Sequence, residues 1–124
     1  MNTKIIIGGI ILIFILLGVW SWSINRVPGP KVDLDGFASC LSAKNITMYG
    51  AAWCPHCQTE KKNFGKSFRL IKYVECPENQ AKCLSVGVTS YPTWILGDGS
   101  KFVGGQGLSK LSEISACSLP AGAL

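Results

Sequence analysis

The sequence has one histidine and no second Cys-x-x-Cys, and these two absences count against a zinc site. The histidine, His56, lies inside the one Cys-x-x-Cys present, between Cys54 and Cys57. A structural zinc site needs four ligands, usually as two pairs of similar spacing. We therefore expect no metal ion, and a metal- or cluster-carrying role for Cys54 and Cys57 remains only an alternative.

Charged residues are also few, and no basic cluster with interleaved aromatic residues occurs. The chain has 12 Lys or Arg and seven Asp or Glu among 124 residues, a net charge of +5. Lys4, Arg26 and Lys31 flank the apolar N-terminus, so much of the excess lies beside that segment rather than on the remainder. Because nucleic-acid binding requires a basic face, we expect no nucleic-acid partner.

The N-terminal segment is the longest apolar run. Residues 5–24 carry no charge, and a helix of about 20 residues spans about 30 Å, the thickness of a bilayer core. Trp20 and Trp22 suit the interface with water. We predict an uncleaved transmembrane anchor over residues 1–24. The alternative is a cleaved signal peptide, whose apolar region is normally about 7–15 residues long and ends in a small-residue site.

A short linker and one folded domain are expected after the anchor. Pro28, Gly29 and Pro30 predict a stiff linker over residues 25–32, and residues 33–124 are long enough for one small core. Six cysteines in so short a chain indicate an oxidising compartment. We therefore expect a single-pass membrane protein with a cytoplasmic N-terminus. Its domain would lie in the periplasm, at the cell exterior or in a compartment like the thylakoid lumen.

The Cys54–Cys57 motif is the main candidate for chemistry. An apolar run, residues 46–52, precedes it and a helix-forming run, residues 58–64, follows. This pattern predicts a strand, a turn and a helix that begins with Pro55, a residue suited to the first helical position. A helix start stabilises a thiolate at Cys54, and protonated His56 would add positive charge. Cys57, one turn on, could resolve a mixed disulfide formed at Cys54.

Hydrophobic patterning predicts an α/β domain in the order α-β-α-β-α-β-β-α. Asp35 is expected to cap the first helix, and the Asp98-Gly99 pair predicts a hairpin between the last two strands. The expected helices are residues 36–44, 55–67, 78–86 and 108–116, and the expected strands are residues 46–51, 70–75, 93–96 and 100–103.

That order, with Trp53–Cys57 after the first strand and Ser90–Thr93 before the third, resembles the thioredoxin fold. The resemblance covers residues 36–117 and implies a central mixed sheet flanked by helices. It also implies that Pro92 is cis beside the cysteines, that Tyr91 offers backbone groups to substrate, and that Trp53 contacts substrate or partner. Reducing thioredoxins carry a buried acid where this chain has Met48. Together with His56, this difference favours an oxidant.

A closer resemblance is to the thioredoxin-like domains fused to, or partnered with, vitamin K epoxide reductase homologues. It rests on Phe37–Leu41, Tyr49–Cys57, Tyr73–Cys76 and Tyr91–Trp94. It implies an oxidoreductase that exchanges disulfides with cysteine-containing proteins and passes electrons to a membrane quinone reductase of that type. No cofactor beyond the Cys54–Cys57 disulfide is implied. The alternatives are a reductase or isomerase fed from the membrane, and a non-catalytic adaptor.

The other four cysteines allow three pairings. We favour Cys76–Cys83, which closes a short loop, together with Cys40–Cys117, which ties the first helix to the last. The second resemblance also implies a disulfide at the positions of Cys76 and Cys83. A redox role for Cys76–Cys83 is the alternative to a structural one.

Overall fold

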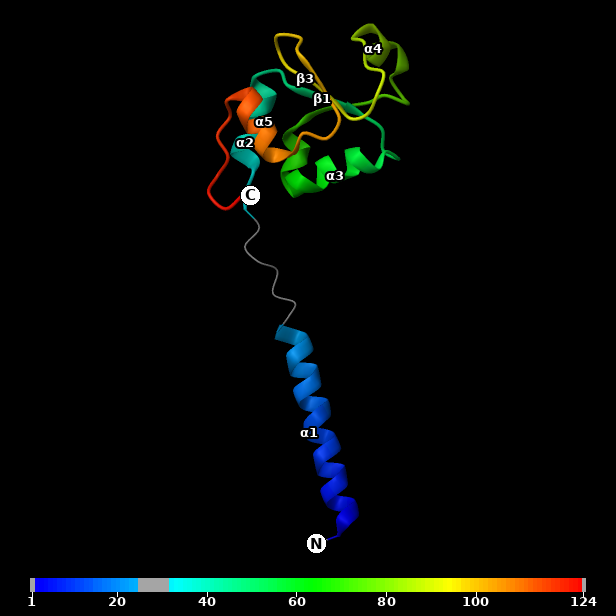
Figure 1. Cartoon of the computed structure of the whole chain (residues 1–124), viewed down its shortest axis with the longest axis vertical. Coiled ribbons are helices and arrows are strands. Elements are labelled where there is room, and N and C mark those ends of the chain that lie inside the picture. Colours follow the sequence, from blue (N-terminus) through cyan, green and yellow to red (C-terminus); the bar gives the residue numbers. More distant parts are fainter. Residues whose placement is uncertain (1, 25–31, 124) are drawn as a thin grey trace. The chain divides into compact units, whose positions relative to one another are not determined.

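The computed structural model describes residues 2–24 and 32–123, and the chain divides into two units, Met1–Lys31 and Val32–Leu124 (Figure 1). In the first unit, helix α1 covers Thr3–Ile24, where the sequence predicts a membrane anchor. Over the residues that are described, however, no helix meets the length and apolarity that a membrane crossing requires. The predicted linker, apart from Val32, lies outside the described residues.

Residues 32–123 form an α/β domain around a mixed four-stranded sheet, which confirms the predicted class and order of elements. The strand order is β2-β1-β3-β4, with β1 parallel to β2 and antiparallel to β3, and β3 antiparallel to β4. The strands are β1 (Thr47–Gly50), β2 (Lys72–Glu75), β3 (Thr93–Ile95) and β4 (Lys101–Val103). The helices are α2 (Asp35–Ala43), α3 (Pro55–Phe64), α4 (Gln80–Ser85) and α5 (Gly107–Ser115).

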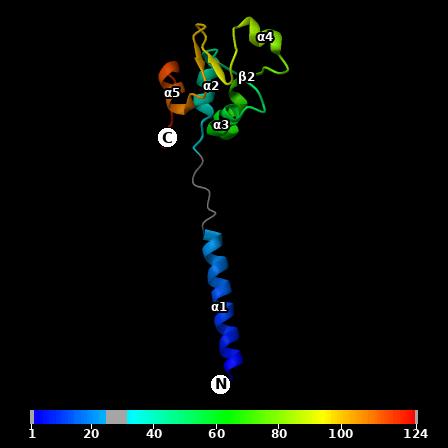
Figure 2. The ribbon, with the colours of Figure 1, turned by 45° about the vertical axis from the view of Figure 1, so that its right-hand side comes forward.

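Two apolar clusters form because neighbouring residues of a strand point to opposite faces of the sheet. Met48 of β1 lies opposite Trp94 of β3, and both are fully buried with α2, α3 and α5 in the larger cluster. Tyr49, the next residue, belongs to a smaller cluster with Cys83 of α4 and Val88. Helix α4 accordingly lies apart from α2 and α5 in both views of the ribbon (Figures 1 and 2).

The structure corrects two details at helix ends. Helix α3 ends at Phe64, not near residue 67, because Gly65 has a φ of 53°, and the chain continues as a 3-10 helix, η1 (Gly65–Leu70). Asp35 does not cap α2 but is its first residue. Its carboxylate instead accepts hydrogen bonds from Arg69 and Ser67 of η1. These two partners, Arg69 above all, hold the pKa of Asp35 well below its usual range.

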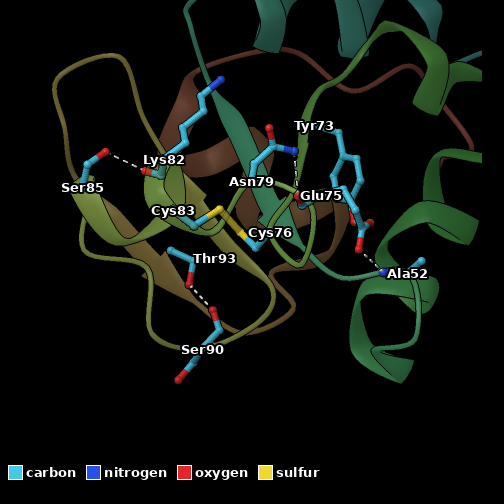
Figure 3. The surroundings of a disulfide bond; sticks show 10 residues. All are labelled: Ala52, Tyr73, Glu75, Cys76, Asn79, Lys82, Cys83, Ser85, Ser90 and Thr93. Carbon is cyan, nitrogen blue, oxygen red and sulfur yellow. Dashed lines mark hydrogen bonds between the residues drawn. A yellow bond between two sulfur atoms is a disulfide. The ribbon is translucent and has the colours of Figure 1, made fainter.

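Two disulfides close the domain, in the pairing that the sequence favours. Cys40 of α2 is bonded to Cys117, which follows α5, across 77 residues of chain. Cys76, directly after β2, is bonded to Cys83 of α4 across seven residues (Figure 3). The first bond therefore joins the two ends of the folded domain, and the second fixes α4 to the end of β2.

Candidate active site

The two remaining cysteines, Cys54 and Cys57, carry free thiols at the start of α3. Strand β1 ends at Gly50, and the turn that follows places Cys54 at the N-cap of α3, with Pro55 as the first helical residue. Cys57 lies in the first turn. Cys54 is 5% exposed and Cys57 is fully buried. The motif therefore has the strand–turn–helix setting that its sequence predicts, with Cys54 as the more accessible sulfur.

Burial makes the Cys57 thiol a weaker acid than an ordinary cysteine. It raises the pKa of Cys57 to about 11, and the adjacent Cys54 thiol adds to this effect. A hydrogen bond from the Ala51 backbone and the positive charge of Lys61 act in the opposite direction. Cys57 is consequently a protonated thiol at neutral pH, and it must lose a proton before it can attack a disulfide.

The loop before β3 faces Cys54. The Tyr91–Pro92 peptide bond is cis, and the Cys54 thiol donates a hydrogen bond to the Tyr91 carbonyl oxygen, with sulfur and oxygen 3.7 Å apart. Trp53 is 69% exposed, and its ring meets that of Tyr91 edge-on at 6.1 Å between centroids. The structure thus brings together Trp53, Cys54 and Tyr91, while His56 is exposed on α3.

A groove with a volume of about 420 Å³ adjoins this loop. It is lined by Trp53 and Tyr91 next to Cys54, and by Pro77, Cys83, Leu84 and Val88 from the connection between β2 and β3. Leu84 is 69% exposed, so its side chain presents apolar surface along this groove. The sequence does not show that Leu84 of α4 and Val88, in the segment after it, would lie beside Tyr91, because this contact depends on how the connection packs against the sheet.

Glu75 and Tyr73, at the end of β2, support the turn that carries Cys54, a role that the sequence alone does not show. One Glu75 carboxylate oxygen accepts a hydrogen bond from the Ala52 backbone N–H at 2.8 Å, and the other accepts one from the Tyr73 hydroxyl at 2.5 Å (Figure 3). Gln58 of α3 donates to the Ala52 carbonyl at 2.9 Å. The turn before Cys54 is therefore held from both β2 and α3.

A buried carboxylate, Glu60, also holds α3 in place, through contacts with β3 and α5. It is 3% exposed and accepts hydrogen bonds from the Trp94 indole N–H at 3.0 Å and from the Gly107 backbone N–H at 2.9 Å. Buried carboxylates require such donors. Glu60 thereby ties the helix that begins with the cysteine pair to β3 and to the start of α5. Its sequence context, a polar residue in a polar helix, gave no sign of this role.

Gly50 provides the space that Cys57 occupies. A Cβ atom at Gly50 would lie 2.8 Å from the Cys57 sulfur and 3.3 Å from a ring carbon of Tyr73. We expect Gly50→Ala to lower the free energy of unfolding by about 1–3 kcal/mol, the usual cost of overpacking, as measured by denaturant unfolding.

Gly36→Ala is the matched control for this prediction. Gly36 lies in α2, where an added Cβ meets nothing within 4 Å, and alanine there should stabilise the helix by up to about 1 kcal/mol. A Gly50→Ala protein as stable as the wild type would contradict the assigned role of Gly50.

Over the described stretches, 2–24 and 32–123, no three His, Cys, Asp or Glu side chains are grouped so that they could hold a metal ion.

The strand order, the cysteine pair at the start of α3 and the cis proline before β3 together define a thioredoxin-like α/β domain. The chain is 35% identical over 92 residues to the thiol-disulfide oxidoreductase LTO1 of Arabidopsis thaliana, a match that covers 66% of this chain and 24% of the relative. The chain therefore spans about a quarter of that relative's length. The X-ray structure of Fasciola hepatica thioredoxin matches with a TM-score of 0.46 and 22% identity, over 57% of this chain and 76% of the other. No protein-family model matches the chain.

Proposed function

We propose that this domain is a protein thiol–disulfide oxidoreductase whose redox centre is the Cys54–Cys57 pair. The observation that carries the proposal is the free thiol of Cys54 at the N-cap of α3, which faces the Tyr91 carbonyl next to the cis peptide. The identity with a protein named as a thiol-disulfide oxidoreductase supports it. No cofactor is needed, because the two sulfur atoms carry both electrons.

The chemistry follows from the unequal environments of the two sulfurs. When a reduced pair meets a substrate disulfide, the Cys54 thiolate attacks one sulfur and forms a mixed disulfide, releasing the other substrate thiol. Cys57 then attacks Cys54, and the second substrate thiol leaves as the Cys54–Cys57 disulfide forms. Substrate oxidation is the same sequence in reverse, so both directions use the same residues.

The groove beside Cys54 suits an extended substrate segment. Tyr91 offers its backbone groups next to Pro92, and Trp53 and Leu84 present exposed apolar surface. We propose that the residues flanking the substrate cysteine lie here, with an apolar side chain against Leu84 and Val88. Burial of one such side chain would contribute about 1.5–3 kcal/mol to binding.

The partner and location are proposed from the sequence. The similarity of Tyr49–Cys57 and Tyr73–Cys76 to domains that work with vitamin K epoxide reductase homologues supports a membrane quinone reductase as the electron acceptor. The uncharged residues 5–24 support a tether to the same membrane, with the domain outside the cytoplasm. Alkaline extraction of membranes tests the tether, since release of the intact chain would contradict it.

The direction of electron flow depends on the reduction potential of the pair. Met48 in place of a buried acid, and His56 between the cysteines, support net oxidation of substrates. A potential near that of thioredoxin, about −270 mV, would instead support the reductase or isomerase alternative.

Trapping the mixed disulfide tests the proposed function. In Cys57→Ala the resolving thiol is absent, so we expect an adduct at Cys54 that persists for hours rather than turning over. Alkylation of free thiols, followed by non-reducing electrophoresis and mass spectrometry of membranes from the native host, would identify the bound proteins. Cys54→Ala/Cys57→Ala is the control and should form no adduct. Failure of Cys57→Ala to form any adduct would refute the exchange reaction.

A further inference from the structure

Attack by Cys57 on the mixed disulfide requires a group that accepts the proton of its thiol. Its sulfur is fully buried, and burial keeps it protonated at neutral pH, yet resolution of a mixed disulfide requires the thiolate. Met48 of β1 belongs to the same buried cluster as Cys57, and its apolar side chain cannot accept a proton. We therefore expect the acceptor on another element.

Strand β2 supplies such a group. The Cys57 sulfur and the Tyr73 hydroxyl both lie within 3.5 Å of one point, the position that a Cβ atom at Gly50 would occupy. The Tyr73 hydroxyl in turn donates a hydrogen bond to the Glu75 carboxylate at 2.5 Å (Figure 3). Burial, the Glu75 carboxylate and the nearby cysteine sulfurs all raise the pKa of Tyr73. Tyr73 is therefore a neutral hydroxyl that can pass a proton on, not a phenolate that stores one.

Glu75 is suited to be the end of this path. It is partly exposed, so its carboxylate can exchange protons with solvent, whereas Cys57 cannot. Its other oxygen holds the Ala52 N–H at 2.8 Å, which fixes the carboxylate relative to the turn that carries Cys54. A hydrogen bond thus connects the half-buried Tyr73 hydroxyl, which lies near the buried Cys57 sulfur, to the partly exposed Glu75 carboxylate.

We propose that Tyr73 and Glu75 form the proton path of Cys57, with the Tyr73 hydroxyl as relay and the Glu75 carboxylate as acceptor. This inference rests on the proposed function, since it concerns the step in which Cys57 attacks the mixed disulfide. Both are positioning and relay residues for that step, because the bond changes occur at the sulfur atoms.

The step balances in atoms and electrons. The Cys57 sulfur bonds to the Cys54 sulfur, the bond between Cys54 and the substrate sulfur breaks, and the substrate leaves as a thiolate with the electron pair. The Cys57 proton moves to the Tyr73 oxygen while the Tyr73 proton moves to Glu75. In substrate oxidation the path runs in reverse, and the Cys57 leaving group recovers its proton from Tyr73.

The other charged groups around Cys57 fit this assignment. The Lys61 ammonium lies 3.8 Å from the centre of the Tyr73 ring, and its charge favours a transient thiolate at Cys57. Cys54 is bonded to substrate during the step and carries no charge then. Glu60, on the same helix, is engaged by Trp94 and Gly107. Glu75 is therefore the carboxylate that the hydrogen bonds connect to Tyr73.

Two nearly isosteric variants test the proposal. Glu75→Gln keeps an oxygen for the Ala52 N–H but removes the base, and Tyr73→Phe removes the relay but keeps the ring. Stopped-flow mixing of each reduced protein with a fluorescent peptide disulfide would resolve formation and decay of the mixed disulfide. We expect both variants to slow decay by about 10²–10⁴-fold at pH 7, the usual contribution of a positioned base, with formation changed less than about twofold.

The dependence of the decay rate on pH separates a proton path from a structural effect. In both variants the rate should rise by about tenfold per pH unit between pH 7 and 9, as hydroxide replaces the missing base, so that the deficit shrinks. Glu113→Gln, an exposed carboxylate paired with Lys110 on α5, is the control and should match the wild type. A deficit that stays constant with pH, or a Tyr73→Phe protein that resolves normally, would overturn the proposal. If the wild type forms no mixed disulfide, the proposed function itself has failed, and the proton path with it.

Discussion

Serine at position 54 is expected to abolish disulfide exchange and at the same time to leave the domain as stable as the wild type or more so. Cys54 carries the sulfur that donates a hydrogen bond to the Tyr91 carbonyl in the loop before β3, and a serine hydroxyl cannot replace a thiolate as the nucleophile. Loss of a nucleophile typically costs several orders of magnitude, so we expect more than about a thousandfold. Reduction of a peptide disulfide with a dithiol as electron donor measures it.

The stability of the same variant is an independent check. Cys54 occupies the N-cap of α3 without a side-chain hydrogen bond to the helix, and serine is among the best N-cap residues, with an advantage of about 1 kcal/mol over a residue that does not cap. Cys57→Ser is the control for the exchange measurement, because its Cys54 thiolate can still attack the peptide disulfide. Exchange that survives Cys54→Ser would move the nucleophile elsewhere. A marked loss of stability would show that the thiol has a packing role not evident from its contacts.

Removing the Cys40–Cys117 disulfide is expected to destabilise the domain more than removing Cys76–Cys83. The bonds close loops with sequence separations of 77 and seven residues. In the chain-entropy model they contribute about 4.5 and 2.5 kcal/mol, both upper values. Each kcal/mol corresponds to roughly 4–8 °C in the melting temperature of a domain of this size. Cys40→Ala/Cys117→Ala should therefore melt well below Cys76→Ala/Cys83→Ala when thermal unfolding is followed by circular dichroism.

The order of the two melting temperatures decides this prediction. Alanine is used at both pairs because Cys117 and Cys76 are almost fully buried and would enclose a serine hydroxyl. The reverse order, with the Cys76–Cys83 variant less stable, would mean that the bond holds α4 against the sheet in a way that loop length does not capture.

The parts of the structure that could be predicted from sequence are those fixed by local chemistry. The run before Gly50, Pro55 at the first helical position and the Cys54–Cys57 spacing determine a strand, a turn and a helix from neighbouring residues alone. The Asp98-Gly99 pair likewise marks the turn between β3 and β4. The end of α3 was placed too late, because the pattern does not show that Gly65 takes a positive φ.

The parts that could not be predicted depend on contacts across the fold. Glu75 and Ala52 are 23 residues apart, and Glu60 and Trp94 are 34 residues apart, so neither pair has a signature within one window of sequence. Asp35 was expected to act locally as a cap, but Arg69 and Ser67 of η1 offered it stronger partners. In each case a charged or polar side chain was given its role by a distant element.

The burial of Cys54 limits which substrates could react under the proposed function. Cys54 is 5% exposed, next to a tryptophan that is 69% exposed. An extended, unfolded segment can reach it, whereas a cysteine buried in a folded protein cannot. Disulfide exchange at Cys54 and Cys57 would therefore be confined to substrate proteins that have not yet folded or that have unfolded. The burial of Cys54 would then select substrates by their folding state as much as by their sequence.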